Sequence, residues 1–427
     1  MKELKTAVET IAYIENLPHY HRKNDLSFIK RALNALGDPQ DRVKTVHVTG
    51  TNGKGSTCYY ISSLLQHAGQ KTGLFVSPYV VKFNERIQLD GQMISDEDLI
   101  ETANQILKIE AQLQSGDTDF KLTTFEFETA MAFWFFAKQS CDYAVIEVGI
   151  GGEHDKTNVI VPQVSVITTI GLDHEKIIGP TLADIAREKS GVIKTGRPVI
   201  LGNIPTDVLP ILLNQAKSRH APVFLLGQDF EISVNQSKLN YCLENDLCYQ
   251  FKRRTQVENF DLAIAVTAFL QLKLSSSKTQ VEHAIDETRL PGRYQVLNTA
   301  PLIVVDGAHN VQAMSHLLDF MHHEQTLRSG RLYVIITLMK DKDIELVFNE
   351  FSQDDRVFLT TLDYPRVAKR DDFPQKIRLK YDYHPDFFEL YQQIEQQARP
   401  EDLILITGSF YLVGAFLQKV MALDNEN

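Results

Sequence analysis

The sequence predicts an α/β fold built on parallel sheets and divided into two domains. Strand-like apolar runs alternate with helix-like segments along most of the chain, which is typical of parallel sheets. A glycine-rich turn joins one apolar run to a helical segment at residues 49–57. The length of 427 residues exceeds one typical hydrophobic core. We therefore predict a domain over residues 1–293 and a second over 294–427.

The first part of the chain alternates between the two periodicities. Apolar residues recur at helical spacing in 4–14, 26–36 and 96–113. Residues 58–67 follow the glycine-rich turn as a helix, and residues 123–137 are apolar nearly all round, which predicts a buried helix. The strand-like runs are residues 43–48, 72–76, 143–148 and 164–170. This order predicts a parallel sheet covered by helices.

The second part begins with a change of character at about residue 224. Short alternating runs over residues 224–251 predict a small antiparallel insert, and residues 256–272 return to a helical pattern. Residues 290–293, Leu-Pro-Gly-Arg, form a breaker cluster that we interpret as a hinge. Four further strand-like runs are residues 302–305, 331–337, 356–361 and 403–406. They alternate with helical segments and predict a smaller, Rossmann-like α/β domain.

Composition limits the classes of function. A net charge of −11 argues against a general nucleic-acid binder but leaves anionic small ligands open. The chain has no apolar stretch long enough for a spanning helix and no signal-peptide core at its start, so we expect a cytoplasmic protein that does not enter membranes. The four cysteines lack metal-ligand spacing, and we expect Cys242 and Cys248 to be reduced. A monomer is the default expectation.

The glycine-rich turn predicts a phosphate-binding loop. It consists of Gly50, Thr51, Asn52, Gly53, Lys54, Gly55, Ser56 and Thr57. Backbone N–H groups, a helix N-terminus and the Lys54 ammonium group together attract phosphate. The loop departs from the strict G-x-x-x-x-G-K-[ST] pattern, because Val48 replaces the first glycine and Gly55 follows the lysine. The alternative is a turn with a solvated lysine, but the order of strand, loop and helix favours phosphate.

Other polar residues also follow predicted strands. In doubly wound sheets, ligands bind outside the carboxyl ends of the strands. Ser77, Glu147 and His174 occupy such positions in the first domain, while residues 306–310 and 407–409 do so in the second. Oxygen ligands at Ser77 and Glu147 suit a hard cation such as Mg²⁺.

Many motifs match one known family in a single order. They are TGTNGKGST (49–57), SPYVVKFNERI (77–87), TTFEFETA (123–130), IEVGIGG (146–152), TNVI (157–160), GLDH (171–174), REKSGVIK (187–194), PGR (291–293), DGAHN (306–310), MKDKD (339–343) and TGSFYLVGA (407–415). On these motifs the chain resembles the folylpolyglutamate synthase and dihydrofolate synthase family of Mur-ligase-like enzymes. The resemblance covers most of the chain and both predicted domains.

The resemblance implies an ATP- and Mg²⁺-dependent ligase. ATP phosphorylates a carboxylate of a reduced folate, and the amine of L-glutamate attacks the acyl phosphate to form an amide. The chemistry is reasonable because a carboxylate has no good leaving group, whereas an acyl phosphate does. Positive groups must offset the repulsion between the two anions.

The resemblance also implies roles for individual residues. Lys54, Glu147, His174 and Lys189 match the catalytic positions, and Ser77, Glu147, His174 and Lys189 match metal positions. The matching lysine of the family is carbamylated, which would make Lys189 an oxygen ligand. On residue chemistry alone, His174 is a turn-capping histidine and Lys189 a solvated lysine. Asn259, Arg293 and Asp306 match positions that hold ATP.

The binding of folate and of glutamate is assigned in the same way. Residues 80–87 resemble the folate-contacting loop, in which Phe83 would stack on the pterin and Arg86 would attract carboxylates; the alternative is a plain surface loop. Glu153 and Asp155 lie in a second folate-binding segment. The positions that match the glutamate site are His309, Ser409 and Tyr411, although Tyr411 reads equally well as a core aromatic residue.

Two segments depart from the family pattern. Dihydrofolate synthases carry Gly-Gly-Arg-Leu-Asp-Ala-Thr-Asn where this chain has Glu153, His154 and Lys156 in place of Arg, Leu and Ala. Residues 24–29 also lack the usual Asp-Leu-Gly-Leu-Glu-Arg. Both departures favour a folylpolyglutamate synthase. A dihydrofolate synthase or bifunctional enzyme is the alternative, and a P-loop kinase or nucleotide switch is a distant one.

Overall fold

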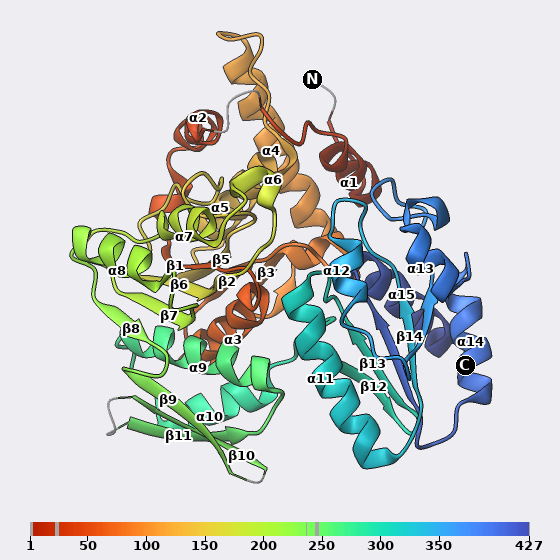
Figure 1. The fold of residues 1–427 in the computed structure, drawn as a ribbon. Helices are drawn as coiled ribbons and strands as arrows, with labels where there is room; N and C mark the ends of the chain where they lie inside the picture. Colours follow the sequence, from red (N-terminus) through yellow and green to blue (C-terminus); the bar gives the residue numbers. More distant parts are fainter. Residues whose placement is uncertain (1–2, 22–24, 236, 244–246, 427) are drawn as a thin grey trace. The chain divides into compact units, whose positions relative to one another are not determined.

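The computed structural model describes residues 3–21, 25–235, 237–243 and 247–426, and it confirms the predicted α/β class (Figure 1). The chain forms two compact units. The first contains residues up to Ser77 together with Phe83–Arg289, and the second contains Pro78–Lys82 and the residues from Leu290 on. This division differs from the predicted one at 293/294: it falls four residues earlier, and a short N-terminal segment joins the second unit.

An eight-stranded sheet forms the centre of the first unit. Its strands are β1 (Lys44–Thr49), β2 (Thr72–Phe75), β3 (Ile87–Leu89), β4 (Gln92–Met93), β5 (Tyr143–Glu147), β6 (Val164–Thr169), β7 (Val199–Asn203) and β8 (Val223–Leu225). The order is β4-β3-β2-β5-β1-β6-β7-β8. The six strands β2, β5, β1, β6, β7 and β8 are parallel to one another, and β3 and β4 add an antiparallel edge. The four predicted strands are therefore neighbours, with β1 between β5 and β6.

Helices cover both faces of this sheet (Figure 1). The helices of this unit are α1 (Ala7–Glu15), α2 (Ser27–Ala35), α3 (Lys54–His67), α4 (Asp96–Gln114), α5 (Thr124–Lys138), α6 (Glu175–Ile178), α7 (Leu182–Ser190), α8 (Leu209–Ser218), α9 (Gln256–Gln271) and α10 (Lys278–Glu287), with short 3₁₀ turns η1 (Pro39–Asp41) and η2 (Phe83–Arg86). Alternation along β7 separates the faces: Leu201 packs with α7 and α8, whereas Gly202 faces Ile264 of α9. Among the described residues, no helix is both long and apolar enough to span a membrane.

A three-stranded antiparallel sheet forms the predicted insert. Its strands are β9 (Phe230–Asn235), β10 (Lys238–Leu243) and β11 (Leu247–Lys252), and β10 lies between the other two. Residues 223–225, close to the predicted start of the insert, belong instead to the large sheet as β8. The register places Cys242 opposite Cys248, and the two form a disulfide. The expectation of a reduced pair is therefore wrong, because directly opposed residues bring the two sulfur atoms together.

The second unit has a six-stranded sheet in the order β12-β13-β17-β14-β15-β16. The strands are β12 (Gln295–Thr299), β13 (Leu302–Asp306), β14 (Leu332–Ile336), β15 (Arg356–Leu359), β16 (Asp382–Tyr383) and β17 (Leu403–Thr407). All neighbours are parallel except β12 and β13. The helices are α11 (Val311–Arg328), α12 (Ile344–Phe348), α13 (Gln375–Lys380), α14 (Phe387–Gln397) and α15 (Phe410–Glu426), with a 3₁₀ turn η3 (Arg370–Asp372). One core layer lies under α11 and α12, and the other under α14 and α15.

The segment Pro78–Lys82 packs into this second layer. Val80 is buried with Val413 of α15 in the same core cluster. A Cβ atom on Gly414 would lie 1.8 Å from the Val80 carbonyl oxygen, so only glycine fits there. The Gln418 side chain donates to the Val81 carbonyl at 2.6 Å. The C-terminal helix therefore holds the five residues that separate Ser77 from Phe83.

Candidate active site

The phosphate-binding loop lies between β1 and α3, as the sequence predicts. The helix begins at Lys54, four residues earlier than expected. Gly55 and Ser56 have low helix propensity, so the sequence does not indicate this first turn, which burial stabilises. Gly53 caps the helix with a φ of +83°, a left-handed conformation that favours glycine. A Cβ atom on Gly53 would lie 2.2 Å from Asp261 Oδ1. The loop therefore depends on glycine for both backbone angle and space.

Threonines at the end of β6 hold the loop in place. The Asn52 N–H donates to Thr169 Oγ1 at 2.9 Å, and the Thr51 N–H donates to the Thr169 carbonyl at 3.0 Å. Thr168 donates from its hydroxyl group to the Asn52 carbonyl. Sequence reasoning missed both threonines. A polar pair ending an otherwise apolar strand was the available signal.

Two lysines meet at one loop carbonyl. Lys54 Nζ donates to the carbonyl oxygens of Gly50 at 3.0 Å and Thr51 at 3.2 Å. Lys189, near the end of α7, donates from Nζ to the same Gly50 carbonyl at 2.9 Å. The structure thus brings together two of the four predicted catalytic residues.

Lys189 is buried, with 4% of its surface exposed. Its burial, and secondarily the charge of Lys54, lower the pKa of its ammonium group to about 7. The alternative of a solvated lysine is therefore wrong. The lowered pKa makes the neutral, nucleophilic amine far more accessible near neutral pH than in a solvated lysine.

The structure also brings together Ser77 and Glu147, two of the four predicted metal ligands. The Ser77 N–H donates to Glu147 Oε2 at 2.9 Å. Glu147 ends β5 and is 2% exposed. On α3, Thr57 Oγ1 is buried without a hydrogen-bond partner among the described residues. The buried carboxylate beside Ser77 fits a hard cation, which prefers oxygen ligands, and the Thr57 hydroxyl is a further oxygen on α3 of the kind such a cation takes.

His174 lies in the loop after β6, at the start of α6, with a φ of +53°. Its N–H donates to Asp173 Oδ1 at 2.9 Å, and its Nε2 lies 3.7 Å from Asp173 Oδ2. A third of its side chain is exposed and no side-chain cap bond forms at this helix start. Its role as a metal ligand stays a prediction.

The predicted folate-binding residues have defined partners in the first unit. Phe83 is buried, and the Arg86 guanidinium lies 5.4 Å from its ring centre. Arg86 Nε also lies 3.3 Å from Glu128 Oε1. Burial raises the pKa of the Glu128 carboxyl, although Arg86 opposes this. Arg86 is thus partnered already, and the plain surface loop is not what forms.

The second folate-binding segment is organised by one carboxylate. Asp155 is buried, and it accepts from the Thr157 N–H at 3.0 Å and the Ile150 N–H at 2.9 Å. Burial raises its pKa, against these hydrogen bonds. Glu153 is exposed, and its N–H donates to the Glu188 carbonyl. Asp155 therefore shapes the loop; whether either residue contacts folate stays a prediction.

Asn259 is buried at the start of α9 and bonds to the backbone of Arg254. Its Oδ1 accepts from the Arg254 N–H at 3.1 Å, and its Nδ2 donates to the Arg254 carbonyl at 3.2 Å. These bonds fix the turn that enters the helix. Contact with ATP by Asn259 stays a prediction.

The second unit gathers its candidate residues at the carboxyl ends of β13 and β17. Asp306 accepts from the N–H groups of Tyr294 at 2.8 Å and Ala308 at 2.7 Å. The Arg293 guanidinium lies 4.8 Å from the ring centre of Phe410. The carboxylate therefore folds the turn between β13 and α11, and the arginine packs on an aromatic face.

The glutamate-binding candidates follow the same two strands: His309 lies in the turn after β13, and Ser409 and Tyr411 lie after β17. His309 bonds through Nδ1 to the Gly307 carbonyl at 2.8 Å. Ser409 Oγ accepts from the Tyr411 N–H at 3.0 Å. The Tyr411 ring stacks on Tyr364 at 4.4 Å, and the two hydroxyl groups lie 3.2 Å apart. Tyr411 is half-buried, so it keeps a polar end; Tyr364 was missed because its segment shows no motif.

Comparison with known proteins identifies the fold and the family. The Mur ligase middle domain matches residues 48–305, and the Mur ligase glutamate ligase domain matches residues 292–410. The folylpolyglutamate synthase of Lacticaseibacillus casei is 33% identical over 433 residues, which cover 97% of this chain and 98% of that protein. The dihydrofolate synthase/folylpolyglutamate synthase of Escherichia coli K12 is 30% identical over 96% of this chain and 95% of that protein.

A solved structure agrees over the full length. The E. coli FolC protein in complex with DHPP and ADP superimposes with a TM-score of 0.89 at 26% identity, and the match covers 99% of this chain and 100% of that one. Mur ligase models, full-length relatives and a full-length structural match all agree, and this chain therefore belongs to the folylpolyglutamate synthase and dihydrofolate synthase family of Mur ligases.

Proposed function

We propose that the protein adds L-glutamate to a carboxylate of reduced folates, with ATP and Mg²⁺, and so makes folylpolyglutamates. Two observations carry the proposal. In the glycine-capped loop at the start of α3, Lys54 lies beside loop carbonyls. At the end of β5, Glu147 is buried next to Ser77. A phosphate cradle next to a buried carboxylate is suited to a metal-bound nucleotide. Relatives that share the whole chain are named for this ligation.

The reaction consists of phosphoryl transfer followed by amide formation. A folate carboxylate oxygen attacks the γ-phosphorus of ATP, and ADP leaves with the electron pair of the broken P–O bond. The glutamate amine then attacks the acyl carbon, loses a proton, and phosphate departs. Lys54 and the loop N–H groups offset the charge that gathers on the phosphates.

Ser77 and Glu147 are the residues that would hold Mg²⁺ in the first unit, and the family resemblance adds His174 and Lys189 as ligands. When bound, the ion would supply positive charge at the phosphate oxygens. The buried Glu147 carboxylate, which accepts from the Ser77 N–H, supports this assignment. The assignments of Arg293 and Asp306 to ATP, and of His309, Ser409 and Tyr411 to glutamate, rest on the family resemblance.

Carbamylation of Lys189 belongs to the same proposal. The neutral amine attacks the carbon of CO₂, a C–N bond forms, one C=O bond opens to an oxyanion, and the ammonium proton passes to solvent. A buried amine with a pKa of about 7 favours this step. The product would place an anionic oxygen ligand beside Gly50 in place of the amine.

One observation bears on the acceptor. The two segments that depart from the family pattern touch each other: Lys156 Nζ donates to the Asp25 carbonyl at 2.7 Å. Lys156 also lies 3.6 Å from the buried carboxylate of Glu126, to which His21 bonds at 2.7 Å. We propose that Lys156, at this junction of the two segments, weakens dihydropteroate ligation. The bifunctional enzyme remains the second candidate, since relatives such as the E. coli protein carry both names.

The test measures ADP release in the presence of Mg-ATP and L-glutamate, with tetrahydrofolate monoglutamate or dihydropteroate as the acceptor. We expect turnover with the folate and little with dihydropteroate, and a gain with dihydropteroate in Lys156→Ala. Equal turnover of the wild-type protein with both acceptors would establish the bifunctional enzyme. Glutamate-independent ADP release would instead indicate a kinase or nucleotide switch.

A further inference from the structure

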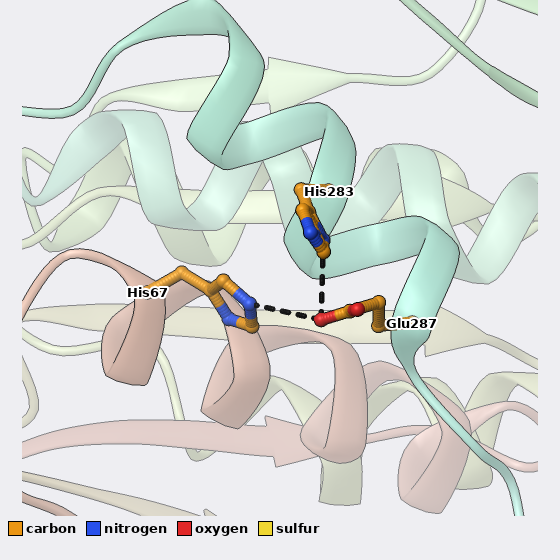
Figure 2. Close-up of side chains that lie close together, drawn as sticks. All are labelled: His67, His283 and Glu287. Atoms are coloured by element: carbon orange, nitrogen blue, oxygen red, sulfur yellow. Dashed lines mark ion pairs between the residues drawn. The ribbon is translucent and has the colours of Figure 1, made fainter.

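Three side chains of types that bind metals meet at the surface of the first unit, where the C-terminal ends of two packed helices lie together. His67 is the last residue of α3, and His283 and Glu287 lie one turn apart on α10, with Glu287 as its last residue (Figure 2). His67 Nε2 lies 3.4 Å from Glu287 Oε2, and His283 Nδ1 lies 3.1 Å from the same oxygen. One ligand atom from each residue falls within 4.8 Å of the others. We refer to these three residues as the two-histidine cluster.

The tautomer of His67 is set by a second bond. Its Nδ1 lies 2.9 Å from the Ser63 carbonyl oxygen, and a carbonyl can only accept, so Nδ1 carries the proton. In the neutral ring, the lone pair is then on Nε2, the nitrogen that lies 3.4 Å from Glu287 Oε2 (Figure 2). Metal-binding histidines are usually oriented by such a bond from the other ring nitrogen.

The backbone around the cluster is fixed without an ion. Ser63 Oγ donates to the Ala284 carbonyl at 2.9 Å, and Gln280 Nε2 donates to the His67 carbonyl at 3.1 Å. Both bonds join α3 to α10 within one turn of the cluster. The three ligands are therefore held on rigid helices rather than on a loop, which reduces the ordering that binding requires.

The electrostatics of the two helices favour a cation here. The last turn of a helix carries partial negative charge, and a carboxylate such as Glu287 at that position is unfavourable on its own. Both α3 and α10 end at the cluster. His283 and Glu287 are more than half exposed, so an ion can enter from solvent.

We propose that the two-histidine cluster binds a divalent transition metal of the zinc class. Two imidazole nitrogens and one carboxylate oxygen suit Zn²⁺, with water completing the coordination, and suit Mg²⁺ poorly. The site is separate from Ser77 and Glu147: α3 carries the phosphate-binding loop at its first residue and the cluster at its last. Its occupation would clamp the far end of that helix to α10.

The test uses the untagged full-length protein and zinc chloride as the probe, in calorimetric titrations without ATP or Mg²⁺. We expect one zinc-binding event that His283→Ala and Glu287→Gln each abolish. His323→Ala, which removes an exposed histidine from α11, should retain it. His154→Ala should also retain it, because it alters the other candidate group of ligands, Glu153, His154 and Glu188.

A second measurement separates binding from damage to the fold. Without zinc, His283→Ala should melt at the wild-type temperature, because the side chain is exposed. With zinc, the melting temperature should rise for the wild type and not for His283→Ala. Retention of the event by His283→Ala, its equal loss in His323→Ala, or its displacement by millimolar Mg²⁺ would each overturn the proposal.

Discussion

Replacement of Gly53 by alanine tests the phosphate-binding loop, and Gly196 provides a matched control. Both glycines adopt left-handed backbone angles, with φ of +83° and +69°. A Cβ atom on Gly196 meets nothing within 4 Å, whereas on Gly53 it would lie 2.2 Å from the buried carboxylate of Asp261. The pair therefore separates backbone strain from steric conflict.

The expected cost follows from these two contributions. A left-handed alanine costs about 1–2 kcal/mol, and this applies to Gly196→Ala and Gly53→Ala alike. Displacing a buried neighbour adds about 1–3 kcal/mol, and this applies to Gly53→Ala only. The loss of unfolded-state freedom that accompanies Gly→Ala is common to both and cancels. The difference between the variants should thus be about 1–3 kcal/mol.

Urea unfolding followed by circular dichroism gives the free energies of unfolding, and initial rates of ADP release give the KM for ATP. Gly53→Ala should raise this KM by about tenfold, equivalent to about 1.4 kcal/mol, while Gly196→Ala should leave it unchanged. Equal destabilisation of the two variants with an unchanged KM would refute the reasoning, since the loop would then tolerate a side chain at its centre.

The other predictions concern a lysine, a glycine and a histidine. Lys189→Met should slow glutamate-dependent ADP release by at least about tenfold, and CO₂-depleted buffer should slow the wild type until bicarbonate is added; insensitivity to both changes would exclude carbamylation. Gly414→Ala should displace Pro78–Lys82, because its Cβ atom meets the Val80 carbonyl at 1.8 Å, and it should raise the KM for folate while the KM for ATP stays constant; parallel changes in both would contradict this. His322 bonds to Asp355 at 2.9 Å, and this hydrogen bond is the main reason that the pKa of His322 is raised. The stability that this pair supplies is complete below the ordinary pKa of about 6.5 and is lost as the pH rises through the raised value. Urea titrations across this range should show the loss in the wild type and not in His322→Gln.

Local patterns predicted much of the fold. Apolar runs located the central strands β1, β2, β5 and β6, because a buried parallel strand leaves a continuous hydrophobic signal. Edge strands such as β4 were missed, because β4 has two residues and both are exposed, and the interior strand β7 was missed as well. The disulfide was missed because the alternation of side chains does not fix the register of the hairpin. Only the register that the structure shows places Cys242 opposite Cys248.

The candidate site was predictable where ligands follow strand ends. Ser77 and Glu147 were expected together, and a hydrogen bond joins them. The environment of Lys189 was not predictable from residue patterns. Its burial depends on how α7 packs against a loop some 139 residues earlier in the chain, and charged residues around it suggested a solvated helix. Similarly, nothing local revealed that Glu128 would pair with Arg86.

The placement of Pro78–Lys82 has a consequence for recombination between related ligases. The chain passes from one unit to the other after Ser77, after Lys82 and after Arg289. A fragment that ends at Arg289 would carry Val80 without its apolar neighbours, and a fragment that begins at Leu290 would leave the space beside Gly414 unfilled. A chimaera that exchanges the C-terminal module must therefore exchange this pentapeptide with it.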